Sequence, residues 1–106
     1  VIGIFSFKAA HFLQSIGDFS PCNYITTVGT HPDFRNRGVS RAMYHFALNQ
    51  LSTTYPSSYW VTRTWSTNQY HLKLLDQLGF TPVKVLKNDR GDAIDTIYLA
   101  LSMTPP

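Results

Sequence analysis

The chain has 106 residues, of which 43% are hydrophobic, 14% aromatic and 14% charged, and its formal net charge is +3. This length suits one domain, and so few charges beside so much apolar content exclude an intrinsically disordered chain. The single cysteine, Cys22, excludes an internal disulfide, and no apolar run approaches the roughly 18 residues of a membrane span. These features predict one cytoplasmic domain over residues 1–103, followed by a tail at 104–106.

The first third of the chain predicts two strands separated by a long loop. Val1–Lys8 is rich in β-branched and aromatic residues, residues 9–20 carry early helix breakers, and Tyr24–Thr30 again reads as a strand. Gly29 lies inside this second strand, which indicates a bulge or the close approach of another group. Strict alternation would place one set of its side chains on a common face: Tyr24, Thr26, Val28 and Thr30.

Apolar residues at helical spacing predict an amphipathic helix over Val39–Leu51. The stripe expected to face the core comprises Val39, Ala42, Met43, Phe46, Ala47 and Leu51. A strand over Ser58–Trp65 is followed by Ser66-Thr67-Asn68, which supplies three N-cap candidates for a second helix. This helix runs to Leu78, and Asn68 is free for a ligand if Ser66 or Thr67 caps it. Its inward residues are expected to be Leu72, Leu75 and Leu78, with Leu74 flanking them. Gly79 and Phe80 predict a Schellman ending.

Two further strands, Thr81–Lys87 and Ala93–Ser102, flank a predicted turn over residues 88–92 and complete the chain. Strand–helix–strand crossovers require parallel neighbours, whereas the final hairpin is antiparallel. The expected fold is therefore α/β (α+β), a mixed sheet with two main helices packed on it.

The turn between the second strand and the first helix is the strongest candidate for a ligand site. It carries three arginines, Gly38 and Ser40, and it opens a helix whose free N–H groups and dipole favour an anion. Gly38 would let a phosphate approach the backbone closely. The residues expected to bind a phosphorylated ligand are Arg35, Asn36, Arg37, Gly38, Val39, Ser40 and Arg41. The alternative interpretation is an ordinary exposed turn with solvated arginines.

Other chemistry is weakly indicated. The four histidines and Cys22 fit no zinc spacing, so no metal is expected. A nucleophilic Cys22 would need a basic partner, for which His31 is the one candidate. No nucleophile elbow is present, and no pair of carboxylates stands in a catalytic arrangement. His71 stands apart because it lies one helical turn after Asn68, on the face of Leu75.

Two stretches together resemble the GNAT family of N-acetyltransferases. The first is Arg35-Asn36-Arg37-Gly38-Val39-Ser40, preceded by Thr30-His31-Pro32, and the second runs from Asn68 to Leu78-Gly79-Phe80. The resemblance implies a GNAT-like acyl-CoA N-acyltransferase fold and acetyl-CoA as the donor, with its pyrophosphate on the arginine-rich turn. It also implies that the two central parallel strands splay apart and that the pantetheine arm enters between them. The arm would pair with the backbone near Val28, Gly29 and Thr30, and Asn68 would contact it from the other side.

The same resemblance implies direct attack of a primary amine on the thioester within a ternary complex. Leu75 stands where many members carry the tyrosine that protonates the thiolate, and His71 stands where a small residue is usual. His71 could therefore crowd the arm or supply a substitute acid, and Tyr98 is an outside candidate for the same role. The Tyr24–Thr30 strand carries no carboxylate base. The catalytic residues are accordingly left unassigned.

The elements that precede Val1–Lys8 in the family, a strand, two helices and another strand, have no counterpart in this sequence. The chain thus resembles the C-terminal, CoA-binding part of a GNAT domain. An unpaired edge on the first strand would favour a homodimer. Two rival functions remain open. One is a non-catalytic CoA-binding module, favoured by Leu75 and by the missing N-terminal elements, and the other is a small basic nucleic-acid-binding domain resting on Arg35, Arg37 and Arg41. Nucleic acid is the less expected ligand, because the basic residues form no stripe.

Overall fold

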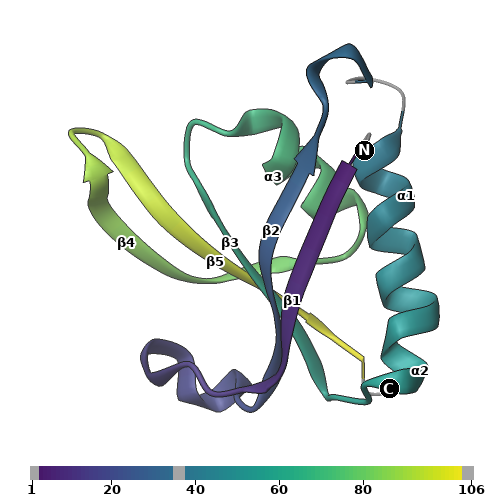
Figure 1. The fold of residues 1–106 in the computed structure, drawn as a ribbon. Coiled ribbons are helices and arrows are strands. Elements are labelled where there is room, and N and C mark those ends of the chain that lie inside the picture. The colour runs from purple at the N-terminus through teal and green to yellow at the C-terminus, as the bar shows by residue number, and fades with distance from the viewer. Residues whose placement is uncertain (1–2, 35–37, 104–106) are drawn as a thin grey trace.

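The computed structural model of the chain describes residues 3–34 and 38–103, so the predicted contribution of residues 35–37 lies outside the described part. Five strands form one sheet, and helices cover one of its faces (Figure 1). The elements in chain order are β1 (Gly3–His11), η1 (Gln14–Phe19), β2 (Cys22–Thr30), η2 (Pro32–Phe34), α1 (Val39–Phe46), η3 (Ala47–Leu51), α2 (Ser52–Thr54), β3 (Tyr59–Trp65), α3 (Gln69–Gln77), β4 (Thr81–Gly91) and β5 (Ile94–Ser102). The first strand and the first helix are both longer than predicted, since β1 reaches His11 and η3 and α2 continue α1 to Thr54.

The sheet is mixed, as predicted, with the strand order β1-β2-β3-β5-β4. Strands β2 and β3 are parallel, and every other neighbouring pair is antiparallel. The crossover through α1 joins two neighbouring parallel strands. The prediction of parallel neighbours is wrong for the crossover through α3, because β5 inserts between β3 and β4.

Helices α1 and α3 pack on the same sheet face and share one core with it. The buried members of this core are Ile25, Tyr44, Ala47, Trp60, Leu74, Leu75, Phe80 and Leu99. A second cluster, which includes Cys22, Val61 and Tyr98, lies on the opposite face, where η1 contributes Ile16. The alternation of Trp60 with Val61, and of Leu99 with Tyr98, assigns the two clusters to the two faces.

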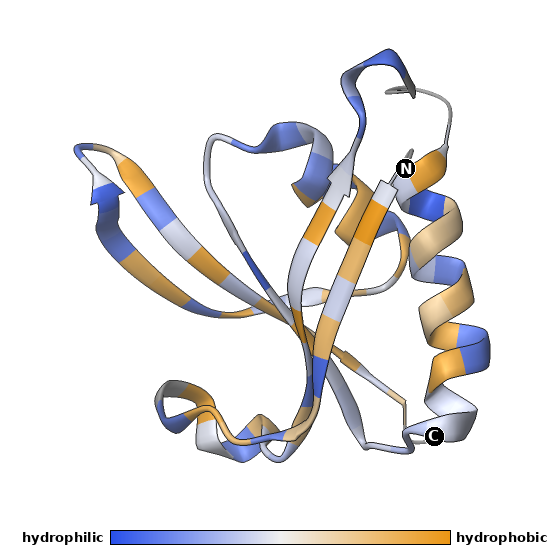
Figure 2. Ribbon diagram, viewed as in Figure 1, coloured by the Kyte–Doolittle hydropathy of each residue, from blue (hydrophilic) through white to orange (hydrophobic). Residues whose placement is uncertain are grey.

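The predicted core stripe of the first helix is wrong in part. Tyr44 and Ala47 are fully buried, whereas the side chain of Phe46 is 57% exposed. Val39, Met43 and Phe46 instead line an apolar groove of about 540 Å³ between α1 and β1; Figure 2 shows hydrophobic segments on both elements. The buried row runs from Tyr44 through Ala47 to Leu51, a helical spacing as regular as the one predicted.

A bulge changes the facing of the residues on β2. Ser6 pairs with Thr27 and Phe7 with Ile25, so Thr26 is the extra residue. Ile25 and Val28 consequently both face the helix-covered core, against the prediction from strict alternation. Gly29 is not the bulge, since it pairs regularly with Ile4.

The ending predicted for α3 is confirmed. Gly79 has a φ of 98°, its N–H donates to the Asp76 carbonyl at 3.0 Å, and the N–H of Phe80 donates to the Leu75 carbonyl at 3.0 Å. These two bonds define a Schellman motif. Leu74, expected to flank the core, is 3% exposed and therefore belongs to it.

The last hairpin is longer than predicted. Strand β4 continues to Gly91, through most of the predicted turn, and the chain reverses at residues 92–93. Four residues of β4, 87–90, lie opposite Asp95 alone, because Leu86 pairs with Thr96 and Gly91 with Ile94. This irregularity is stabilised by side chains described below.

Candidate functional site

Strands β2 and β3 separate after only three paired positions. The parallel ladder joins Asn23 to Trp60, Tyr24 to Val61 and Ile25 to Thr62, and then stops. Beyond it β2 pairs with β1 up to Thr30, and β3 pairs with β5 up to Trp65, so the strands diverge (Figure 1). The backbone edge of residues 26–30 that faces β3 therefore has no strand partner in the described structure. An extended ligand with amide groups can bind such an edge as a further strand would.

The open edge of β2 leads to the N-terminus of α1. Gly38 is the residue before the helix and has a φ of 75°, and no side chain among the described residues caps this end. The hydroxyls of Thr30 and Ser40 are 2.9 Å apart, which fixes the end of β2 against the first turn of α1. The free N–H groups and the helix dipole make this end favourable for an anion.

The backbone conformation at residue 38 gives a second reason for glycine there, beside the predicted close approach of a phosphate. A Cβ built on it meets no described atom within 4 Å, so space within the protein does not require glycine. The left-handed φ does, because most other residues are strained there. The close approach of a phosphate to the backbone of Gly38 stays a prediction.

Arg41, expected to bind a phosphate, points toward the other helix. Its Nη2 donates a hydrogen bond to Oε1 of Gln77, near the C-terminal end of α3. The bond links α1 to α3 across the sheet face that they cover. A phosphate would have to compete with Gln77 for this guanidinium.

Asn68 is the N-cap of α3. Its Oδ1 accepts a hydrogen bond from the His71 N–H at 3.4 Å, so Asn68 itself caps the helix and leaves the Nδ2 group of the side chain for another acceptor. Ser66 does not share the capping, because it binds Asp95 on β5.

His71 and Tyr44 meet between the two helices. Nε2 of His71 lies 2.6 Å from the Tyr44 hydroxyl, and Nδ1 lies 3.2 Å from Oγ1 of Thr64. Burial lowers the pKa of His71 and raises the pKa of Tyr44, which a hydrogen bond from Thr62 lowers in part. Both rings are therefore neutral at pH 7. Thr62 is the last residue of β3 paired with β2, so this polar cluster lies at the point of divergence.

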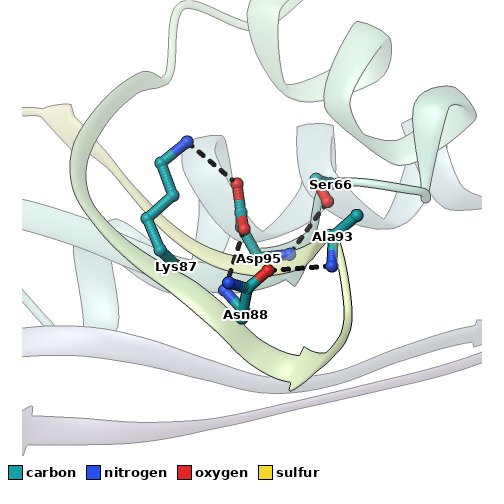
Figure 3. A network of polar contacts seen from close by, with 5 residues as sticks. All are labelled: Ser66, Lys87, Asn88, Ala93 and Asp95. Carbon is teal, nitrogen blue, oxygen red and sulfur yellow. Dashed lines mark hydrogen bonds and ion pairs between the residues drawn. The ribbon is translucent and has the colours of Figure 1, made fainter.

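A network of polar contacts positions the turn that precedes α3 (Figure 3). The Asp95 carboxylate accepts hydrogen bonds from Nζ of Lys87 at 3.2 Å and from the N–H of Asn88 at 3.0 Å. These bonds lower the pKa of Asp95, the one from Asn88 contributing most. Asn88 Oδ1 in turn accepts a hydrogen bond from the Ala93 N–H at 2.8 Å.

The backbone of Asp95 connects this network to the turn before α3. The Asp95 N–H donates to Oγ of Ser66 at 3.0 Å, and this contact links β5 to the turn that leads to Asn68.

Comparison with known proteins gives structural matches only. No protein-family model matches the chain, and no curated protein matches it in sequence. Three of the similar solved structures are the ribosomal-protein-S18-alanine N-acetyltransferase of Escherichia coli (TM-score 0.77, 16% identity), yncA of Salmonella typhimurium with its cofactor acetyl-CoA (0.79, 18%) and a GNAT-family acetyltransferase of Bacillus cereus (0.74, 17%). They cover 99%, 100% and 98% of this chain, respectively. The chain has the GNAT fold.

The chain spans 63%, 60% and 64% of the length of these three GNAT-fold structures. The structural matches confirm the predicted fold, which has a mixed sheet, two main helices and diverging central strands. The residues predicted to bind the cofactor fall around the divergence wherever the structure describes them: Val28, Gly29, Thr30, Gly38, Val39, Ser40, Arg41 and Asn68. Their contacts with a ligand stay predictions.

The structure also places four other residues that were weighed for chemistry. Cys22 is fully buried, and burial raises the pKa of its thiol to about 11, so it is no nucleophile at pH 7. His31, its suggested partner, follows the opposite end of β2. Tyr98 belongs to the cluster on the face away from the helices and cannot join Tyr44 and His71. Leu75 is fully buried in the core.

Within residues 3–34 and 38–103, no three His, Cys or Asp side chains gather in a way that could hold a metal ion. No helix of the described part is long and apolar enough to cross a membrane. Tyr44, which hydrogen-bonds to His71, was not predicted from the sequence. The spacing of Tyr44, Ala47, Leu48 and Leu51 is the signal that could have revealed its inward orientation.

Proposed function

We propose that this chain binds acetyl-CoA and belongs to an N-acetyltransferase that moves the acetyl group to a primary amine by direct attack in a ternary complex. The observation that carries this proposal is the divergence of β2 and β3 beside the N-terminus of α1. One opening thus offers an extended backbone edge for the pantetheine arm and a helix N-terminus for the pyrophosphate.

The donor would lie along this opening. Its pyrophosphate would accept hydrogen bonds from the first N–H groups of α1, and its arm would follow β2 toward Ile25. Five residues of strand span about 17 Å, enough for an extended arm with two amides. The groups proposed to bind the donor are Val28, Gly29, Thr30, Arg35, Asn36, Arg37, Gly38, Val39, Ser40, Arg41 and Asn68. The cofactor named for the similar yncA structure supports this choice.

The chemistry requires a neutral amine and a route for one proton. The new N–C bond forms, the C–S bond of the thioester breaks, and the proton released by the amine ends on the CoA thiol. His71 belongs to the polar cluster at the point of divergence, and its lowered pKa keeps the ring neutral, so that it can accept a proton. Leu75 offers no acid of its own.

A second candidate function is a CoA-binding module without catalysis. The specific observation in its favour is the burial of Leu75 in the core, together with the lack of any carboxylate on β2. Such a module would bind acetyl-CoA as described above and leave the thioester intact.

An acetyl-transfer assay separates the two functions. The chain is incubated with acetyl-CoA and a panel of primary amines, and free CoA thiol and acetylated amine are both quantified. Stoichiometric formation of the two products is expected for the transferase. Acetyl-CoA binding without either product would support the module. Absence of both binding and transfer would contradict both proposals.

A further inference from the structure

The sheet face opposite the helices carries a second set of functional groups at the point of divergence. Lys8 pairs with Tyr24 across β1 and β2, and Tyr24 pairs with Val61 across β2 and β3. Arg63 shares the face of Val61, two residues before it, and pairs with Tyr98 on β5. Paired residues on neighbouring strands point to the same side. Lys8, Tyr24, Arg63 and Tyr98 thus project from one face, which we call the basic face.

The basic face carries two positive charges, Lys8 and Arg63. Lys8 and Arg63 are both exposed, and neither belongs to an ion pair between described residues. The chain has six acidic residues, and all of them lie outside β1, β2 and β3. Strands β1, β2 and β3 therefore carry Lys8 and Arg63 but no carboxylate.

Two tyrosines, Tyr24 and Tyr98, are neighbours of the more central cation, Arg63. Tyr98 is 8% exposed, and Tyr24 is half-buried beneath His11, whose ring stacks on it at 5.4 Å. Burial raises the pKa of Tyr24, and the charge of Arg63 lowers it in part, as expected for close neighbours. An exposed guanidinium beside tyrosines, with no acidic partner among the described residues, is suited to bind a carboxylate, with which it forms two parallel hydrogen bonds.

We propose that the acceptor is a primary amine that carries a carboxylate, and that Arg63 binds this carboxylate. The inference rests on the proposed function, because the donor would then approach from the helix side and the acceptor from the basic face. Nearby positive charge also lowers the pKa of the reacting ammonium group, and so favours the neutral amine that attacks the thioester. The same charges disfavour polycationic acceptors.

The test uses product-like ligands, so that it does not require turnover. N-acetylglycine and N-acetylglycinamide differ in charge and match closely in shape. Each is titrated into the chain in the presence of saturating CoA, and binding is followed by NMR. N-acetylglycine should bind at least about tenfold more tightly, as expected for one charge-assisted contact. In Arg63→Gln the preference should fall to within about twofold.

A matched control is Arg90→Gln, which removes another cation, one that stacks over Trp65 at 4.7 Å on the distal hairpin. This variant should keep the full preference for N-acetylglycine. Equal affinity for the two ligands, a preference that survives Arg63→Gln, or no binding of either ligand to the CoA-loaded chain would overturn the inference. So would inorganic phosphate binding as tightly as N-acetylglycine. Failure of CoA to bind at all would instead contradict the proposed function, and CoA binding is measured in the same samples.

Discussion

Tyr44 on α1 and His71 on α3 share a hydrogen bond of 2.6 Å between the phenol and Nε2 of the imidazole. The bond joins the two helices at the point where β2 and β3 diverge. Arg41 and Gln77 form a second link between the same helices. Two side-chain contacts therefore join α1 and α3 beside the opening between the strands.

Removal of the Tyr44 hydroxyl should destabilise the fold while preserving its packing. In Tyr44→Phe, the ring remains, and Nε2 of His71 loses its partner in a partly buried position. We expect a loss of about 1–3 kcal/mol in the free energy of unfolding, measured by urea denaturation. The control is Tyr70→Phe on the same helix as His71, where the side chain is 58% exposed and the change should stay within about 0.5 kcal/mol. Equal effects of the two substitutions would contradict the role assigned to the hydroxyl.

The stability of the protein should fall as pH drops below the ordinary pKa of histidine. Burial lowers the pKa of His71 from 6.5, so below pH 6.5 the unfolded chain takes up a proton that the folded chain still excludes. The contribution of neutral His71 to the free energy of unfolding is therefore fully present above pH 6.5 and is lost as the pH falls below that value. Asp95, whose pKa is lowered from 3.8, acts only at more acidic pH. Denaturation of the wild type and of His71→Gln from about pH 5 to about pH 8 checks this, and an equally steep decline in both proteins would exclude His71 as its source.

A charge placed at residue 38 should weaken binding of CoA without unfolding the helix. Asn and Asp both tolerate the left-handed φ of Gly38 better than most residues, and both are good N-caps. Gly38→Asp adds a negative charge beside the proposed pyrophosphate, whereas Gly38→Asn is its neutral match. We expect Gly38→Asp to bind acetyl-CoA about tenfold to hundredfold more weakly than Gly38→Asn. The thermal stability of Gly38→Asp should equal or exceed that of Gly38→Asn, because the helix dipole favours a negative charge at this end. The same affinity in both variants would place the phosphates elsewhere.

The contact between Ser66 and Asp95 should contribute measurably to stability. Ser66→Ala removes the acceptor of the Asp95 N–H and loosens the turn that leads into α3. A loss of about 0.5–1.5 kcal/mol in the free energy of unfolding is expected. Thr67→Ala, at the exposed neighbouring position, serves as the control and should be close to neutral. If both variants had the stability of the wild type, the network of Figure 3 would not brace this turn.

Local signals in the sequence predicted the parts of the structure that depend on a few adjacent residues. Asn68 caps α3 and Gly79 ends it, because an Asx cap and a left-handed glycine have few alternatives. The strand order could not be predicted in the same way, since the insertion of β5 between β3 and β4 depends on pairing between distant residues.

The buried face of α1 and the facing of β2 were mispredicted for related reasons. Two apolar rows run along α1, and contact with the sheet selects the row with Tyr44 over the row with Met43. On β2, the bulge at Thr26 shifts every later side chain by one position. Such a shift is defined by the pairing of β2 with β1, so it cannot be read from the sequence of β2 alone. The cluster of Tyr44 and His71 was hidden by the first of these errors.

Isothermal titration calorimetry of the chain with acetyl-CoA tests the central claim most directly. If the opening between β2 and β3 and the N-terminus of α1 form a CoA site, the titration should show saturable binding to a single site with a dissociation constant below about 1 mM. No detectable binding at about millimolar acetyl-CoA would contradict both the transferase and the CoA-binding module.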